Sequence, residues 1–273
     1  MWRRDFLKVL GLAPLSLSLP PRAGADSWQH YEGPNFTGWE VVVGDGVYAA
    51  PGEPPVGPSD IETVHYTTYS ELRANIRRRR IMAHNITFKR IVDENAFEYI
   101  HTCGFAFRLP YLPTTDNFDL NAQTLEGGLF VWDGSTTRLD YGVGFQWVLN
   151  PWMDIFGEIR TWKADGNEGQ WEGVGYLTPD TRWHEIKIVV DFKRGTTSVE
   201  IDGTPYPACL SRTPRAETWG PETAARLQAE IVSLYPEPSG IRAMHQAEFK
   251  DWFWVWEPQP ACRVFLPFVR AGA

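Results

Sequence analysis

Short stretches in which apolar and polar residues alternate recur along most of this chain, and they constrain its fold more than any other feature. Side chains alternate across a β-strand, so each stretch predicts a strand with one face in a core. The predicted strands span residues 81–91, 97–109, 125–132, 138–149, 154–164, 170–178, 182–192, 197–203, 227–236 and 245–258. One short helix is predicted over 221–228, beginning at Pro221. This pattern predicts an all-β fold, an antiparallel two-sheet sandwich or jelly roll.

The sandwich is predicted to be one domain over residues 61–258. Residues 26–60 form a Pro/Gly-rich segment that leads into it, and residues 259–273 form a C-terminal tail. The 24 Gly, 21 Pro and 13 Trp favour strands, turns and aromatic surface over a helical bundle. We find no internal repeat, and 273 residues suit one large domain.

The first 25 residues have the features of an export signal. Arg3-Arg4 followed by Phe6-Leu7-Lys8 resembles the twin-arginine signal, and Ala23-Gly24-Ala25 is a candidate cleavage site. The apolar run from Val9 to Leu19 is too short for a stable membrane span. The resemblance implies a periplasmic, cell-surface or extracellular protein, with the twin-arginine translocation machinery as its partner during export.

Charge argues against one class of partner, and the cysteine spacing gives no sign of a zinc motif. The formal net charge of -8 argues against nucleic acid as a partner. No Cys/His spacing suggests zinc. Cys103 shares its strand side with aromatic residues and is predicted to be a buried thiol, while Cys209 and Cys262 are a candidate pair after export.

The faces of four predicted strands suggest a binding surface. If the strands over 125–178 form consecutive hairpins, one sheet face gathers carboxylates, an Arg, a Gln and aromatic rings. These candidate carbohydrate-binding residues are Glu126, Trp132, Gln146, Glu158, Arg160, Trp162 and Tyr176. Aromatic rings stack on the C–H faces of sugars, and fixed polar groups bond hydroxyls. Gly142 and Gly144 leave a strip without side chains on this face, where a ligand or another backbone can approach.

Residues 183–203 resemble a hairpin of the concanavalin A-like lectin/glucanase superfamily, especially of its laminin-G-like members. The resemblance rests on Trp183-His184, Asp191, Gly195 and Asp202-Gly203, and it extends loosely from Phe97 to Trp256. It implies a concanavalin A-like jelly roll. The superfamily contains lectins, adhesive modules, glycoside hydrolases and polysaccharide lyases, so the fold does not choose the function.

Two carboxylates in this hairpin, Glu200 and Asp202, raise the question of a catalytic motif. Laminarinase-type hydrolases of this fold continue Glu-x-Asp with a third carboxylate, whereas Gly203-Thr204-Pro205 follows here. The hairpin is therefore predicted to be scaffold, and Asp202-Gly203 at its end is predicted to form a turn with positive φ at the Gly.

A polysaccharide-cleaving enzyme is the rival prediction. Glu158 and Glu172, on neighbouring strands, could serve as the two carboxylates of a glycoside hydrolase. Arg160 with Tyr176 could instead serve a polysaccharide lyase, which neutralises a uronate and needs a base. One geometric feature separates the two predictions. An enzyme requires such a pair to converge within about 6 Å in an open groove, whereas a binding module does not.

Calcium is a possible cofactor. Two acidic loops offer oxygen ligands: Asp116 and Asp119 in one, Asp165 and Asn167 in the other. Neither loop follows an EF-hand pattern. The sequence thus favours an exported, lectin-like protein that binds a polysaccharide or envelope glycan without catalysis. A structural envelope protein without a ligand is the third alternative.

Overall fold

The computed structural model describes residues 28–44, 57–76, 82–116, 123–132, 141–165, 168–212, 221–234 and 243–259. The predicted export signal, Cys262 and nearly all of the C-terminal tail lie outside these residues. Among the described residues, no helix is long and apolar enough to cross a membrane.

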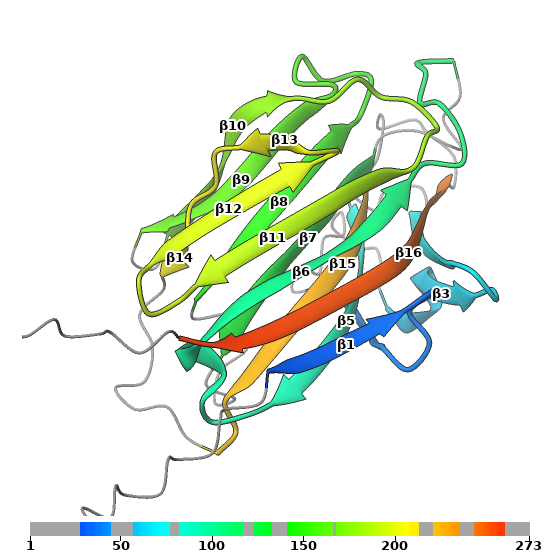
Figure 1. The fold of residues 1–273 in the computed structure, drawn as a ribbon. Coiled ribbons are helices and arrows are strands. Elements are labelled where there is room, and N and C mark those ends of the chain that lie inside the picture. Colours follow the sequence, from blue (N-terminus) through cyan, green and yellow to red (C-terminus); the bar gives the residue numbers. More distant parts are fainter. Residues whose placement is uncertain are drawn as a thin grey trace, which may run out of the picture.

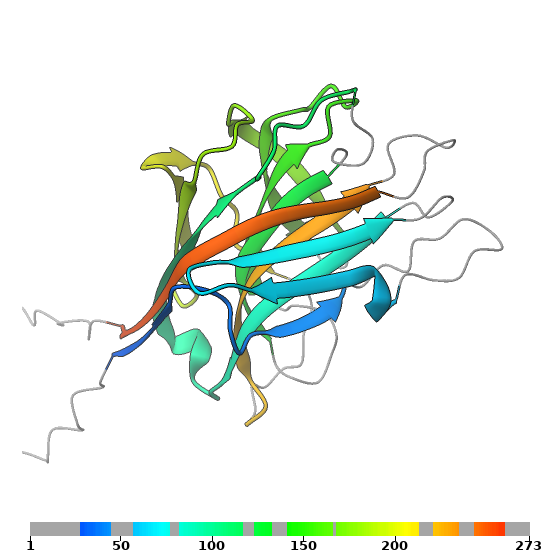
Figure 2. The same ribbon diagram turned by 90° about the vertical axis from the view of Figure 1, so that its right-hand side faces the viewer.

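Two antiparallel sheets pack face to face (Figures 1 and 2). The first sheet contains, in spatial order, β13 (Thr204–Tyr206), β12 (Thr196–Ile201), β11 (His184–Asp191), β6 (Tyr99–Arg108), β16 (Ala243–Pro258), β4 (Ser70–Ile76) and β3 (Ile61–His65), with β1 (Gln29–Gly33) also paired to β16. The second contains β10 (Glu168–Tyr176), β9 (Glu158–Asp165), β14 (Ser211–Arg212), β8 (Tyr141–Leu149), β7 (Gln123–Trp132), β15 (Ala224–Leu234), β5 (Met82–Val92) and β2 (Glu40–Val43). The predicted all-β, antiparallel two-sheet sandwich is confirmed.

The predicted helix at 221–228 is wrong. Residues from Ala224 onward form β15, which pairs with β5 on one side and β7 on the other. Leu227, Ala229 and Ile231 alternate into the core and are fully buried. Burial between two neighbouring strands therefore outweighs the local helix signal. The helical segments among the described residues are two short 3₁₀ turns, η1 (Pro58–Asp60) and η2 (Ala96–Glu98).

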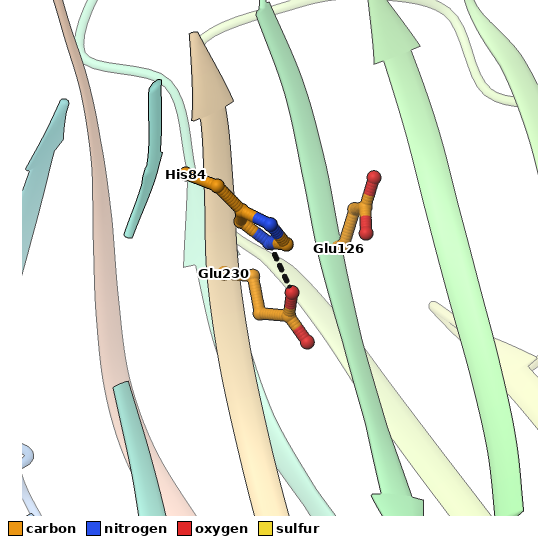
Figure 3. Close-up of side chains that lie close together, drawn as sticks. All are labelled: His84, Glu126 and Glu230. Atoms are coloured by element: carbon orange, nitrogen blue, oxygen red, sulfur yellow. Dashed lines mark hydrogen bonds and ion pairs between the residues drawn. The ribbon is translucent and has the colours of Figure 1, made fainter. Parts of the chain in front are cut away.

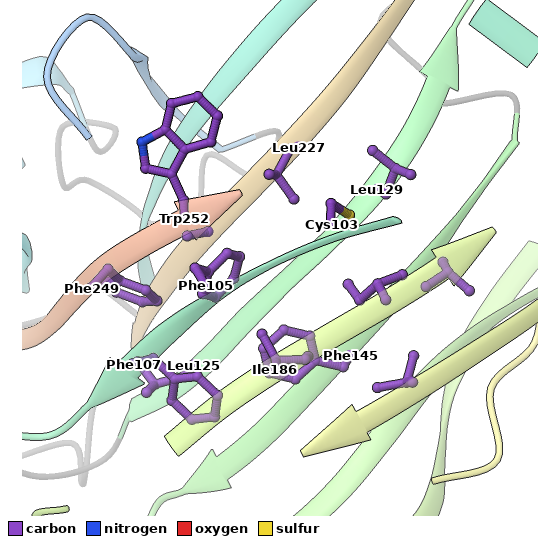
Figure 4. Packing of buried hydrophobic residues seen from close by; sticks show 14 of the residues in the cluster. Cys103, Phe105, Phe107, Leu125, Leu129, Phe145, Ile186, Leu227, Phe249 and Trp252 are labelled. Carbon is purple, nitrogen blue, oxygen red and sulfur yellow. The ribbon is translucent and has the colours of Figure 1, made fainter. Parts of the chain in front are cut away.

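The core lies between the two sheets and is rich in aromatic rings (Figure 4). Phe105 and Phe107 of β6 meet Phe145 of β8, with ring centroids 6.4 and 5.8 Å apart. Cys103 is fully buried in this core, and burial raises the pKa of its thiol. The predicted buried thiol is thus confirmed.

Asp202 follows β12 and bonds back to the beginning of β11, and the turn at Asp202-Gly203 leads into β13. Asp202 accepts hydrogen bonds from the backbone N–H of Glu185 at 2.9 Å and from the His184 ring at 2.7 Å. The other ring nitrogen of His184 lies 3.0 Å from Asp180. Gly203 has a φ of 75°, as the predicted turn requires, and Asp202 itself has a φ of 52°. These bonds use Asp202 to fix the hairpin.

His101 is a second buried histidine, and both of its ring nitrogens have partners. Nε2 donates to the carbonyl oxygen of Ala96 at 2.6 Å, and Nδ1 accepts from the indole N–H of Trp254 at 3.1 Å. The imidazole is therefore neutral. Burial lowers the pKa of His101 to about 4.

We expect stability to decrease in mild acid because of His101. The unfolded chain takes up a proton at this residue near pH 6.5, whereas the folded chain resists until about pH 4. The part of the free energy of unfolding that depends on His101 is therefore at its full value above pH 7. It decreases as the pH falls, by about 2 kcal/mol at pH 5. Urea unfolding at pH 7, 6 and 5 measures it. His101→Gln has no titrating group there, so an equal loss in that variant would contradict the assignment.

Candidate functional site

The second sheet has one face in the core, and the opposite face is called here the outer face. On β7, Leu125 and Leu129 point into the core, so Glu126 and Trp132 lie on the outer face. The strand register pairs Glu126 with Gln146, Gln146 with Arg160, and Glu158 with Tyr176. All seven candidate residues from the sequence therefore share the outer face, while their role in binding stays a prediction.

A polar pair, with Gln146 buried and Glu126 partly buried, lies near the middle of this face. The side-chain amide of Gln146 donates to one oxygen of Glu126 at 2.7 Å, and the Thr124 hydroxyl lies 3.4 Å from the same oxygen. Burial and the nearby Glu230 raise the pKa of Glu126 to about 7, against the opposite influence of His84 and these hydrogen bonds. Two carboxylates with little water around them share this part of the sheet.

Glu230 lies directly opposite Glu126 in the register, on the central strand β15. One of its oxygens contacts Nε2 of His84, and the other accepts from the amide of Gln228. The side chain of Glu230 is 6% exposed and that of His84 is 16% exposed. His84 comes from β5, so three different strands supply this group (Figure 3).

The three side chains form a set of convergent metal ligands, called here the His-Glu-Glu cluster (His84, Glu126 and Glu230). One potential ligand atom from each lies within 4.8 Å of the other two. One imidazole stands against two carboxylates, so the three groups together carry net negative charge when both carboxylates are ionised. Imidazole nitrogen and carboxylate oxygen are ligands that transition metals accept together.

Arg226 lies on the same face of β15, four residues before Glu230, and aromatic rings stand beside its guanidinium. The Arg226 guanidinium lies 4.1 Å from the Phe88 ring centre and 4.6 Å from the Trp132 ring centre. These are cation–π contacts. Arg226 covers part of the Trp132 ring, and this side chain remains partly exposed to solvent.

A second group of side chains lies on β9 and β10. Arg160 donates to the carbonyl oxygen of Trp171 at 2.7 Å and lies 3.4 Å from Glu158. Trp162 and Trp171 meet edge to face, with centroids 5.4 Å apart. These rings are partly exposed beside fixed polar groups. Tyr176, 59% exposed, lies beyond them at the sheet edge.

The strip without side chains at Gly142 and Gly144 is covered. A Cβ at Gly142 would lie 1.8 Å from the Phe130 ring. A Cβ at Gly144 would meet Phe130, Trp162 and Trp171 at 3.5 Å. The glycines therefore admit neighbouring rings, and the expectation that a ligand or backbone approaches this strip is corrected.

The expected hydrolase pair, Glu158 and Glu172, is corrected as well. Glu158 lies opposite Tyr176, whereas Glu172 lies opposite Thr161. A β-bulge between Gly173 and Gly175 inserts one residue and reverses the alternation of faces. Glu172 therefore lies on the face opposite Glu158, where it pairs with Lys163 at 3.0 Å.

The comparisons with known proteins come from structure alone. No family model matches the chain, and no curated protein matches it. Among solved structures, the chain is similar to lectin I from Ulex europaeus, with 11% identity, 84% of this chain and 98% of that chain covered, and a TM-score of 0.46. It is similar to a glycoside hydrolase family 16 endo-glucanase from Bacteroides ovatus, with 10% identity, 80% and 94% covered, and a TM-score of 0.45.

A sialidase is also similar, at 10% identity and a TM-score of 0.45, and the chain spans 16% of that protein's length. A lectin and an endo-glucanase are thus both among the similar structures. At these identities and TM-scores they decide neither the ligand nor the activity of this chain.

The sequence-based prediction missed His84, Gln228 and Glu230. A signal for two of them exists in the stretch AARLQAEIVSL, where Arg226, Gln228 and Glu230 alternate with apolar residues. That period of two predicts a strand with a polar face. Their convergence with residues of β5 and β7 depends on the sheet order, which no local pattern specifies.

The predicted calcium loops are not tested. Asp119 and Asn167 lie outside the described residues, as does the side chain of Asp165. Asp116 is exposed. Within the described part of the chain, the metal-ligand group that converges is the His-Glu-Glu cluster, on the sheet face.

Proposed function

We propose that the protein binds a carbohydrate chain on the outer face of the second sheet. One observation carries the proposal: partly exposed tryptophans and fixed hydrogen-bonding side chains share this face across neighbouring strands. Trp162 and Trp171 offer ring surface, and Arg160 is held beside them by its bond to a backbone carbonyl. Rings that stack on sugar C–H faces, next to preorganised polar groups, suit a glycan.

Cleavage is less well supported by the same geometry. Glu126 and Glu230 approach within the distance of a retaining pair. However, both oxygens of Glu230 already accept hydrogen bonds, and 6% of its side chain is exposed. A nucleophile must reach the anomeric carbon, so this closed arrangement favours binding without chemistry.

A panel of immobilised polysaccharides tests the proposal. The purified chain is incubated with neutral and uronate-containing glycans, and retention and product release are measured in the same tubes. We expect retention without products, and about tenfold or greater weakening in Trp162→Ala. Trp28→Ala is the matched control, because Trp28 is 67% exposed next to β1 of the other sheet.

Two outcomes would contradict binding on this face. The first is retention that is equal in the wild type, Trp162→Ala and Trp132→Ala. The second is the release of reducing ends or unsaturated uronates, which would make the protein an enzyme. Circular dichroism of each variant separates a lost binding surface from a lost fold.

A further inference from the structure

We propose that His84, Glu126 and Glu230 bind a divalent transition-metal ion, with Zn²⁺ as the preferred ion. The inference does not depend on glycan binding, because it concerns the metal alone. It rests on three ligand atoms that three adjacent strands bring within 4.8 Å of one another. Structural and catalytic zinc sites use these ligand types, and three protein ligands leave one position open.

The hydrogen bonds around the cluster are arranged as metal sites require. Gln146 donates to one oxygen of Glu126, and Gln228 donates to one oxygen of Glu230. Each amide holds one oxygen of its carboxylate in place, so the second oxygen remains as the candidate metal ligand. For Glu230 that second oxygen is the one at His84 Nε2. Such outer bonds orient ligands and tune their affinity.

A buried oxygen beside the cluster is an independent indication. Gln228 is 5% exposed, and its side-chain carbonyl oxygen has no hydrogen-bond donor within the described part of the chain. Buried polar atoms without partners are rare in folded proteins. A metal ion with a bound water would supply a donor next to this oxygen.

Charge also favours a cation at this position. Two carboxylates face each other across β7 and β15, and one histidine accompanies them. Buried like charges repel each other unless a cation or a proton neutralises them. A divalent ion balances both carboxylates and needs the imidazole in its neutral form.

The ligand set selects among ions. Tetrahedral Zn²⁺ places its ligand atoms about 3.3 Å apart, so Glu126 must approach the other two side chains by up to about 1.5 Å. His84 and Glu230 are already in hydrogen-bond contact, so this pair must instead move slightly apart to admit the ion. Side-chain rotation of Glu126 supplies such a movement without moving a strand. Ca²⁺ prefers six to eight oxygen ligands, and an imidazole nitrogen disfavours it.

Calorimetric titration of the metal-stripped, untagged chain tests the site. With Zn²⁺ we expect one ion per chain and micromolar or tighter affinity, and with Ca²⁺ no binding at this site. His84→Asn, Glu126→Gln and Glu230→Gln should each weaken Zn²⁺ binding by roughly 100-fold or more. Gln146→Ala removes an orienting bond and should weaken it by about 10- to 100-fold.

Glu172→Gln is the matched control, since Glu172 is a carboxylate of the same sheet on the opposite face. It should leave Zn²⁺ binding unchanged. Co²⁺ substitution adds a spectroscopic readout, because three-ligand sites of this kind give visible absorption bands that the same variants should remove. The proposal is overturned if the stripped chain binds no Zn²⁺ at 100-fold excess over micromolar protein. It is equally overturned if stoichiometric binding survives in all three ligand variants.

Discussion

Trp254→Ala lowers the free energy of unfolding by about 4 kcal/mol, the largest loss we expect from one side chain. Trp254 of β16 is fully buried, with its ring centroid 5.4 Å from that of Trp256 and 6.3 Å from that of Tyr31. Removing the indole leaves a cavity in the core between the two sheets. It also removes the donor to Nδ1 of His101, which then lies buried without its partner.

Two further variants separate these contributions. Trp254→Phe keeps most of the ring volume but not the N–H group, so we expect an intermediate loss of about 2 kcal/mol. Trp28→Ala should change stability by less than about 0.5 kcal/mol, because Trp28 is 67% exposed. Urea unfolding of the three variants measures the series. A loss below about 1 kcal/mol in Trp254→Ala would show that this region does not hold the two sheets together.

The sandwich was predictable from the sequence because the period of two holds over most of each long strand, although a bulge interrupts it in β10 and another in β16. The predicted strand over 97–109 contains β6, and the one over 245–258 lies within β16. Apart from β4, whose seven residues pair with β3 on one side and β16 on the other, the missed strands are short or lie at edges, as with β2 at four residues. There, few residues alternate and both faces are partly exposed, so the pattern carries little signal.

The His-Glu-Glu cluster was not predictable in the same way, because it depends on which strands become neighbours. Glu126 was assigned to the correct face from alternation alone. His84 and Glu230 join it only because β15 inserts between β5 and β7. The bulge at Gly173 and Gly175 limits prediction for a different reason: one inserted residue reverses every face assignment beyond it.

Glu126→Gln makes the metal-free protein more stable by about 2–3 kcal/mol at pH 8, the second large effect that we expect. Burial and Glu230 raise the pKa of Glu126 to about 7, above the value of about 4.5 for a free glutamate. For an acid with a raised pKa, the unfolded chain ionises first as the pH increases. The destabilisation is therefore absent below pH 4.5, grows between pH 4.5 and 7, and is complete at pH 8. The amide introduced by this substitution carries no charge and keeps an oxygen that can accept from Gln146.

Urea unfolding in EDTA at pH 5 and pH 8, as a difference between variant and wild type, measures this effect without interference from His101. The gain should be large at pH 8 and small at pH 5. Glu172→Gln should show no such gain at either pH, because its carboxylate is exposed and already paired with Lys163. A Glu126→Gln variant that is less stable than the wild type at pH 8 would show that this carboxylate is stabilising as it stands. Glu126→Gln could instead be more stable than the wild type at pH 8 and also bind Zn²⁺ more weakly. The charge of Glu126 would then lower the stability of the metal-free protein but serve to bind the ion, since natural proteins accept lower stability where function needs it.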